Sequence, residues 1–359
     1  MASASSDTIK VAILDNFHSE ILPSEQYGNY YLQGISIAAD SALKDNHIHV
    51  VYKNFTYGTN PLGILQSLSA IKEWHPDLII GPRSSNQFLL LKNQLNNILV
   101  ISPYATADEV ENMPKNFYSL TLPNSIGVKA FSTYLLNSYP NKDLFVLSQT
   151  DCKSCSQVSE AIISDYSKVN PRVKISQYSM LQQQANSIDI KKVVGDFNFK
   201  NGIVLLPDMS WFSSIMMFRI TNYAQMPVIF IGGDDWGSWN DGVAGKLKAN
   251  YYYQAFRITP WSPDSDLPQS VKFRQLYNEK YHQEPDNISY VAYSVLSSVI
   301  AALNKNPNIC GDIYTQSCIL ISYQKALNAD PNWFRSTNYY VYKVDIAGEK
   351  YFGPIFKAK

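Results

Sequence analysis

The sequence predicts an α/β protein built from two doubly wound lobes, and three observations support this fold class. The chain has 359 residues, more than one ordinary domain holds, and 45% of them are hydrophobic, which is enough for two cores. Short apolar runs alternate with segments of helical spacing, as in parallel sheets whose strands are linked by helices. This alternation restarts near residue 144 without a fixed repeat length, so we expect two sheets and exclude a solenoid.

The first alternation predicts the elements of one sheet. Each strand is a short apolar run that ends at glycine, proline or polar residues. We expect strands at residues 9–14, 49–55, 78–80, 98–101 and 117–120. We expect helices at 31–43 and 61–74, after Ser84 or Ser85, after Thr106, and at 126–136. Residues 15–30 are polar and are expected to form a long connection.

The second alternation predicts the other sheet and the helices that follow it. We expect strands at residues 144–147, 174–178, 202–206, 227–231 and 251–257. We expect helices at 155–169, 188–194, 211–223, 271–281, 288–303 and 319–327. A loop is expected from Cys310 to Cys318, and residues 338–344 and 351–355 are expected to pair as a closing hairpin through Ala347-Gly348.

Two turns that bear hydroxyl groups follow neighbouring strands of the first sheet. Gly81-Pro82 ends one strand, and Ser84 or Ser85 can cap the helix after it. Ser102-Pro103 ends the next strand, and Thr106 can cap a further helix. Both turns lie on the carboxyl edge of one parallel sheet, where open α/β folds bind ligands. Free backbone N–H groups and hydroxyls make this edge a site for a small anion, best a carboxylate.

Two carboxylates follow a buried strand of the second sheet. Asp234 and Asp235 come after Gly232-Gly233, so they also lie at a carboxyl edge, and they would repel a phosphate. If the two lobes face each other, one offers an anion site and the other an acid, which suits a zwitterion with a carboxylate and an ammonium group. The alternative is structural: Asp235 caps the following turn and Asp234 is solvated.

Charge and hydropathy exclude several classes of protein. Thirty basic and thirty acidic residues give a net charge of zero, which argues against nucleic-acid binding and against charge-held membrane association. No apolar run reaches the roughly 18 residues of a membrane helix. The lead MASASSDT lacks the apolar core of a signal peptide and runs straight into a strand, which is typical of the mature end of a secreted protein. Twenty-five tyrosines suit a polar-rimmed cleft, or reflect compositional bias.

The four cysteines fall in two pairs that are close in sequence. Three functions are possible for them: thiol redox chemistry, zinc binding and disulfide bonding. Cys152 and Cys155 form a CxxC at a strand-to-helix turn, which suits thiol redox chemistry. Cys310 and Cys318 have a spacing that fits no common zinc ligand pair. Two disulfides in an oxidising compartment are the structural interpretation, which we favour, most firmly for Cys310–Cys318. No HExxH, GxSxG, Walker loop or GxGxxG occurs, so we expect no metal, no cofactor and no catalytic site.

The chain resembles the type I periplasmic binding proteins, specifically the leucine/isoleucine/valine-binding branch of ABC transporter substrate-binding proteins. The resemblance covers nearly the whole chain, and the order and spacing of its motifs carry it. The motifs are Gln26-Tyr27-Gly28 before Gly34-Ile35-Ser36-Ile37-Ala38, then IIGPRSS, ISPYAT and FIGGDDW. The resemblance implies two Rossmann-like lobes joined by a three-stranded hinge. Lobe one would comprise 1–122 and 255–333, and lobe two 123–254 and 334–359.

The resemblance also implies roles for individual residues. The positions that match those holding the ligand carboxylate are Ser84, Ser85, Tyr104, Ala105 and Thr106. The position that matches the ammonium-binding acid is Asp234, followed by Asp235, and Tyr27 matches an aromatic of the side-chain pocket. Lys153 and Asp208 stand where many members have aromatics, so they suggest a more polar ligand side chain, or are surface charges.

These observations predict a periplasmic or otherwise extracytoplasmic solute-binding protein. It would trap a small amino-acid-like ligand for uptake by an ABC transporter permease, act as a monomer, bind no nucleic acid and catalyse no reaction. One alternative is the extracellular ligand-sensing domain of a receptor, which a transmembrane segment beyond Lys359 would indicate. A less favoured alternative is a thiol oxidoreductase that uses Cys152 and Cys155.

Overall fold

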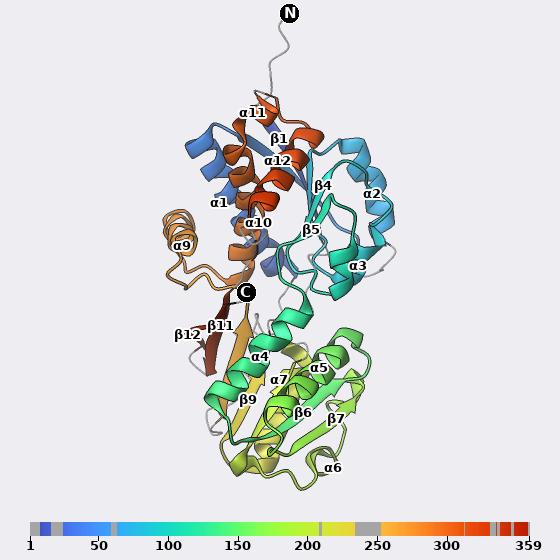
Figure 1. Ribbon diagram of the computed structural model, residues 1–359, viewed down its shortest axis with the longest axis vertical. Coiled ribbons are helices and arrows are strands. Elements are labelled where there is room, and N and C mark those ends of the chain that lie inside the picture. The colour runs from blue at the N-terminus through green and yellow to red at the C-terminus, as the bar shows by residue number, and fades with distance from the viewer. Residues whose placement is uncertain are drawn as a thin grey trace, which may run out of the picture. The chain divides into compact units, whose positions relative to one another are not determined.

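The structure, a computed structural model, describes residues 8–15, 24–58, 63–207, 210–233, 253–311, 313–330, 335, 338–345 and 348–357 (Figure 1). By its internal contacts the chain divides into two compact units. Unit 1 comprises the first strand, Pro23–Pro123 and Ser262–Ser336. Unit 2 comprises Asn124–Trp261 and Thr337–Lys359. The described chain therefore passes between the units three times: after residue 123, after residue 261, and between residues 335 and 338.

Unit 1 contains a five-stranded parallel sheet in the order β2-β1-β3-β4-β5. Apart from the edge strand β2, its strands are almost entirely buried, because helices cover both faces. The strands are β1 Thr8–Leu14, β2 His49–Phe55, β3 Leu78–Ile80, β4 Leu99–Ser102 and β5 Phe117–Ser119. The sequence-based strand bounds are confirmed to within one residue at each end.

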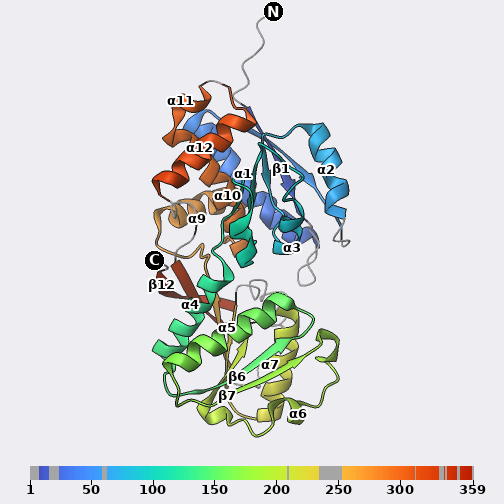
Figure 2. The ribbon, with the colours of Figure 1, turned by 45° about the vertical axis from the view of Figure 1, so that its right-hand side comes forward.

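Helices flank this sheet on two sides. Figures 1 and 2 show α2 and α3 on one side and α1 and α10 on the other. On the first side, Ile64 and Leu68 of α2 and Phe88 of α3 share a core with Leu14 and Ile79 of the sheet. The helices of unit 1 are α1 Ser24–Asn46, α2 Gly63–Trp74, α3 Ser85–Leu90, the 3₁₀ helix η1 Asp108–Asn112, α9 Pro268–Tyr281, α10 Asn287–Lys305, α11 Pro307–Cys310 and α12 Gln316–Ala329.

Unit 2 contains a seven-stranded mixed sheet in the order β12-β11-β10-β9-β8-β6-β7. The strands are β6 Asp143–Gln149, β7 Ile175–Met180, β8 Gly202–Leu206, β9 Val228–Gly232, β10 Tyr253–Thr259, β11 Asn338–Asp345 and β12 Gly348–Lys357. Helix α4 Asn124–Ser138 precedes β6, and α5 Lys153–Val169, α6 Ile190–Val194 and α7 Ser210–Ala224 link parallel strands of the sheet. The 3₁₀ turns are η2 Gln182–Gln184 and η3 Phe199–Asn201. Phe212 and Met216 of α7 pack on Val204 and Phe230 of the sheet.

The two sheets are wound in the same way. In unit 1 the chain places its second strand on one side of the first and the next three on the other. The parallel part of unit 2, β7-β6-β8-β9-β10, repeats that order. The predicted fold class, two doubly wound α/β lobes, is therefore confirmed. The lobe boundary predicted at residue 255 stays a prediction. That residue lies within β10, which pairs with β9 in the sheet of unit 2.

The closing hairpin is confirmed and extends the second sheet by two antiparallel strands. β11 pairs with β10 through Tyr340 to Val344, and β12 pairs with β11. The β11–β12 ladder shifts register twice, between Tyr339 and Tyr340 and between Val341 and Tyr342. Such irregularities bend a strand pair and increase its twist.

Several helix starts were predicted too late in the sequence, by two residues at α4 and α5, by three at α9 and α12, and by seven at α1. α1 begins at Ser24, so the connection predicted through residue 30 is helical in its last part. Its first turns are polar, and the apolar periodicity that marks the helix begins only at Tyr31. α12 begins at Gln316, inside the loop predicted between the cysteines, because the Thr315 side chain accepts the N–H of Cys318 at 3.3 Å as an N-cap.

Helix α10 is the central helix of unit 1. Among the described residues it alone is long and apolar enough to cross a membrane, and 78% of that stretch is buried inside the protein. It lies directly against α1, where a Cβ on Gly34 would be 2.0 Å from the Ser289 carbonyl oxygen. Only glycine allows the two helix backbones to come this close.

We expect Gly34→Ala to lower the free energy of unfolding by about 1–3 kcal/mol, as overpacking does. Alanine favours a helix by about 1 kcal/mol over glycine, so a loss of stability would come from the contact with α10 and not from helix propensity. Urea denaturation measures the change. Asn29→Ala, at an exposed position of the same helix, is the control and should leave stability equal or slightly higher; a stabilised Gly34→Ala protein would contradict the close packing.

Candidate functional site

The carboxyl edge of the unit 1 sheet is formed by the turns that follow β1, β3 and β4. β3 ends at Gly81, whose φ of +102° and distance to β1 exclude any side chain: a Cβ would lie 2.0 Å from the Leu14 carbonyl oxygen. Gly81 donates its N–H to the Ile101 carbonyl of β4 at 2.7 Å, and the Gly81–Pro82 peptide bond is cis. The turn after β3 is therefore held against both neighbouring strands.

A buried hydroxyl joins this turn to the next one. Ser102, at the end of β4, is fully buried, and its Oγ donates to the Pro82 carbonyl at 2.6 Å. The same Oγ accepts the N–H of Ala105 at 3.0 Å. Ser102 therefore fixes the spacing of the two turns, and its buried side chain is a structural group.

Ser85 makes the second connection between the turns. Its Oγ accepts the N–H groups of Thr106 and Ala107, each at 3.0 Å. The structure thus brings together the predicted turns at Ser84-Ser85 and at Thr106, as expected for two carboxyl ends of neighbouring parallel strands. Because these two N–H groups already have an acceptor, they are not free donors as predicted.

The predicted N-cap role of Thr106 is wrong. The helix that follows is the 3₁₀ helix η1, which begins at Asp108 after Ala107, and no side chain caps it. α3 has only six residues and its N-cap residue, Ser84, makes no side-chain cap bond. Two such short helices have small dipoles, so their contribution to anion binding is smaller than predicted.

Three hydroxyl groups remain as donors at this edge: those of Ser84, Ser85 and Thr106. All three side chains are partly exposed, and none donates a hydrogen bond to another residue in the part of the chain that the structure describes. The Ser85 oxygen has both lone pairs occupied by N–H donors, so this hydroxyl can only donate to a further group. Accepting two hydrogen bonds also polarises its own O–H and strengthens that donation.

The two remaining predicted residues of this edge differ in exposure. Tyr104 is partly exposed. Ala105 is 1% exposed and its side chain belongs to the core beneath the turn, so only its backbone can face a ligand.

An ion pair at this edge was not predicted. Asp15 directly follows β1 and is 1% exposed, and the Nε of Arg83, in the turn after β3, lies 3.7 Å from its Oδ1. The two residues sit where the strand order reverses, between β1 and β3, which is the ligand crevice of open α/β sheets. An acid placed immediately after the first predicted strand was the available signal.

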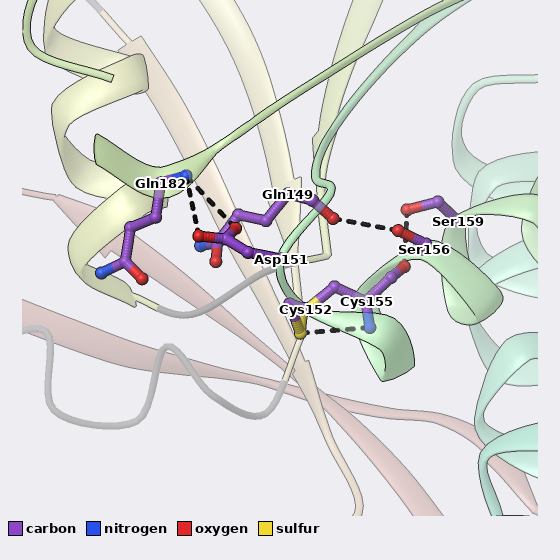
Figure 3. Close-up of a disulfide and its surroundings, with 7 residues drawn as sticks. All are labelled: Gln149, Asp151, Cys152, Cys155, Ser156, Ser159 and Gln182. Carbon is purple, nitrogen blue, oxygen red and sulfur yellow. Dashed lines mark hydrogen bonds between the residues drawn. A yellow bond between two sulfur atoms is a disulfide. The ribbon is translucent and has the colours of Figure 1, made fainter. Parts of the chain in front are cut away.

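The corresponding edge of unit 2 carries the CxxC motif. Cys152 follows β6, is the N-cap residue of α5, and forms a disulfide with Cys155 (Figure 3). The second pair, Cys310 and Cys318, is also joined, so the structure has the two disulfides of the interpretation that the sequence favoured. In each pair the Cα atoms are 5.2 Å apart. No group of three or more metal-ligating side chains occurs among the described residues.

Several predicted site residues lie outside what the structure describes. Asp234 and Asp235 come after β9, and Asp208 after β8, and all three are outside the described residues. The backbone of Tyr27 lies in α1 and that of Lys153 begins α5, whereas their side chains are not among those described. Their roles stay predictions.

We expect Ser85→Ala to destabilise the protein by about 1–3 kcal/mol, because two N–H groups at a partly buried turn lose their acceptor. Chemical denaturation measures this loss. Ser84→Ala is the matched control: its hydroxyl makes no bond to the described chain, and we expect a change within about 0.5 kcal/mol. Equal effects of the two substitutions would show that the Ser85 hydroxyl does not hold the turns together.

No family model matches the sequence, and no curated protein matches it. Solved structures match almost the whole chain. The branched-chain amino acid transporter substrate-binding protein LivJ from Streptococcus pneumoniae, solved with isoleucine, is 13% identical, with 97% of this chain and 99% of that chain covered and a TM-score of 0.76. The leucine-binding protein LivK from Thermotoga maritima is 14% identical, with coverage of 97% and 99% and a TM-score of 0.73.

A third match is a solute-binding protein of an ABC transporter from R. palustris, solved with benzoate. It is 12% identical, with coverage of 98% and 97% and a TM-score of 0.75. Similarity at these identities is evidence of a common fold. The chain has the two-lobe fold of the type I periplasmic binding proteins to which the sequence motifs pointed.

Proposed function

We propose that this protein is an extracytoplasmic solute-binding protein that carries a small carboxylate-bearing ligand to an ABC transporter permease. The observation that supports this proposal most directly is the set of three hydroxyl donors on Ser84, Ser85 and Thr106 at the carboxyl edge of unit 1. The protein acts by binding and release, without covalent chemistry, and as a monomer.

A carboxylate is the anion that fits these donors. Its two oxygens accept several hydrogen bonds, and bonds from neutral hydroxyls to a charged oxygen are stronger than neutral pairs. The Arg83 guanidinium in the same turn offsets the negative charge of the buried Asp15, which would otherwise repel an anion at this edge. The proteins of similar fold support the choice, because isoleucine and benzoate, the ligands named for two of them, share a carboxylate and an apolar body.

For the rest of the ligand we propose an amino-acid-like molecule. Asp234, with Asp235 beside it, would bind the ammonium group, and Tyr27 would line the pocket for the side chain. Lys153 and Asp208 would contact a polar group of that side chain. These assignments depend on the sequence motifs alone, and the lobe boundaries at residues 122/123, 254/255 and 333/334 are proposed on the same basis.

A thermal-shift screen against the twenty amino acids and a panel of simple carboxylates, benzoate included, tests the proposal. A true ligand should raise the melting temperature further as its concentration increases, because it binds only the folded state. A carboxylate-bearing compound is expected among the hits. A screen in which only compounds without a carboxylate stabilise the protein would contradict the proposed ligand class.

Thr106→Val should weaken binding of that ligand by about 1–3 kcal/mol, the value of a hydrogen bond to a charged group. Isothermal titration calorimetry measures the affinity. Thr8→Val is the control, since Thr8 begins β1 at the opposite, amino edge of the same sheet. Unchanged affinity in Thr106→Val would place the carboxylate elsewhere.

Asp234→Ala should distinguish ligands with an ammonium group from those without one. Removing the acid leaves a bound ammonium unpaired, which costs about 3–5 kcal/mol in a buried site. Binding of an amino acid should therefore fall strongly, whereas binding of a carboxylate without an amine should not weaken. Equal effects on both kinds of ligand would rule out the ammonium-binding role.

A further inference from the structure

Neither cysteine of the Cys152–Cys155 disulfide is among the proposed ligand contacts, although Lys153 lies between them, and the two sulfur atoms differ in access. Cys152, the N-cap residue of α5, is partly exposed, whereas Cys155 is only 5% exposed. A thiol that approaches from solvent therefore reaches the sulfur of Cys152, and Cys155 is the leaving sulfur. Figure 3 shows the disulfide at the start of the helix.

The surroundings of Cys152 favour a thiolate. Its Sγ accepts the N–H of Cys155 at 3.2 Å, and it sits at the amino end of a 17-residue helix. A backbone N–H and the positive end of a helix both stabilise a negative sulfur, as they do in other CxxC motifs. When the bond opens, Cys152 is thus a good leaving group and a good nucleophile.

The turn that carries the motif does not depend on the disulfide. Ser156 donates its hydroxyl to the Gln149 carbonyl at 2.9 Å, which ties the first turn of α5 to the end of β6 (Figure 3). The Gln182 N–H donates to both carboxylate oxygens of Asp151, at 3.2 Å each. None of these bonds involves a sulfur atom, so we expect both redox states to have the same fold.

The second disulfide shares one feature with the first, because Cys318 Sγ also accepts a backbone N–H, that of Thr315 at 3.1 Å, at the start of a helix. It differs in access, because the sulfur at the helix start is here the buried one and its partly exposed partner ends a helix. Cys310 ends the four-residue helix α11, and Cys318 lies in the first turn of α12, eight positions further along the chain. The Cys152–Cys155 bond joins residues only three positions apart. The Cys310–Cys318 bond closes a longer loop, so it removes more conformational entropy from the unfolded chain. Its role is structural, and it provides an internal control for the first pair.

We propose that Cys152–Cys155 is a reversible thiol–disulfide exchange site for dithiols. A thiolate of the dithiol attacks Cys152 Sγ, the S–S bond breaks, and Cys155 leaves as a thiolate. The second thiolate of the reagent then attacks the reagent's own sulfur in the mixed disulfide, and Cys152 leaves. The reagent is oxidised to its disulfide, and the protein gains two electrons and, at equilibrium, two protons. The exchange needs no solute, so its failure would leave the proposed solute binding intact.

Titration of the folded, full-length protein with dithiothreitol tests the site. Samples are quenched with iodoacetamide, and mass spectrometry counts the alkylated cysteines of each pair. We expect Cys152 and Cys155 to be alkylated at dithiothreitol concentrations that leave Cys310 and Cys318 bonded, with the melting temperature little changed. Simultaneous opening of both pairs, earlier opening of Cys310–Cys318, or opening only on unfolding would overturn the proposal.

Single-cysteine variants test the thiolate separately. In Cys155→Ser, iodoacetamide should modify Cys152 at pH 7 about ten-fold faster than it modifies Cys310 in Cys318→Ser, because the start of α5 stabilises the Cys152 thiolate, whereas Cys310 ends a short helix. The free energy of unfolding of two double variants, Cys152→Ser/Cys155→Ser and Cys310→Ser/Cys318→Ser, is compared with that of the unchanged protein. The second variant should lose more stability. Equal alkylation rates, or a larger loss in the first paired variant, would show that Cys152–Cys155 is a structural bond.

Discussion

The candidate site depends on one shared hydroxyl. Ser85 lies in the turn after β3, and its Oγ accepts two N–H groups from the turn after β4. It therefore fixes the distance between these two turns. The sheet makes this possible, because the register of β3 and β4 pairs Ile80 with Ile101 and ends both strands at the same level. Since both lone pairs of Ser85 are occupied, the proton that remains must point toward a further acceptor. Structural support and the proposed ligand recognition thus use the same side chain.

The parts of the fold that were predictable are those in which burial dominates. Strands buried on both faces are short continuous apolar runs, and a sequence shows them directly, as for β3 and β8. The start of α1 was missed because its first two turns bear polar side chains, which give no periodicity. The start of α12 was missed because its signal is one capping threonine, Thr315, between two cysteines.

The site was predictable in its location and less so in its chemistry. Parallel strands with hydroxyl-bearing turns predicted that Ser84, Ser85 and Thr106 would share one edge. Whether a backbone N–H is free to bind a ligand depends on contacts between distant parts of the chain. The amides of Thr106 and Ala107 donate to Ser85, which is 21 and 22 positions away. The contact of Asp15 with Arg83 likewise joins distant segments, and its one signal in the sequence is the position of Asp15 directly after a strand.

The irregular ladder between β11 and β12 has a consequence for solubility. An outermost strand exposes a row of unpaired backbone donors and acceptors, which a second molecule can use to extend the sheet into a polymer. Two breaks in register within one short ribbon interrupt the even spacing that such a template needs, and they twist the strand away from flatness. Strand β12 therefore forms the edge of the second sheet and also makes that edge a poor template for aggregation.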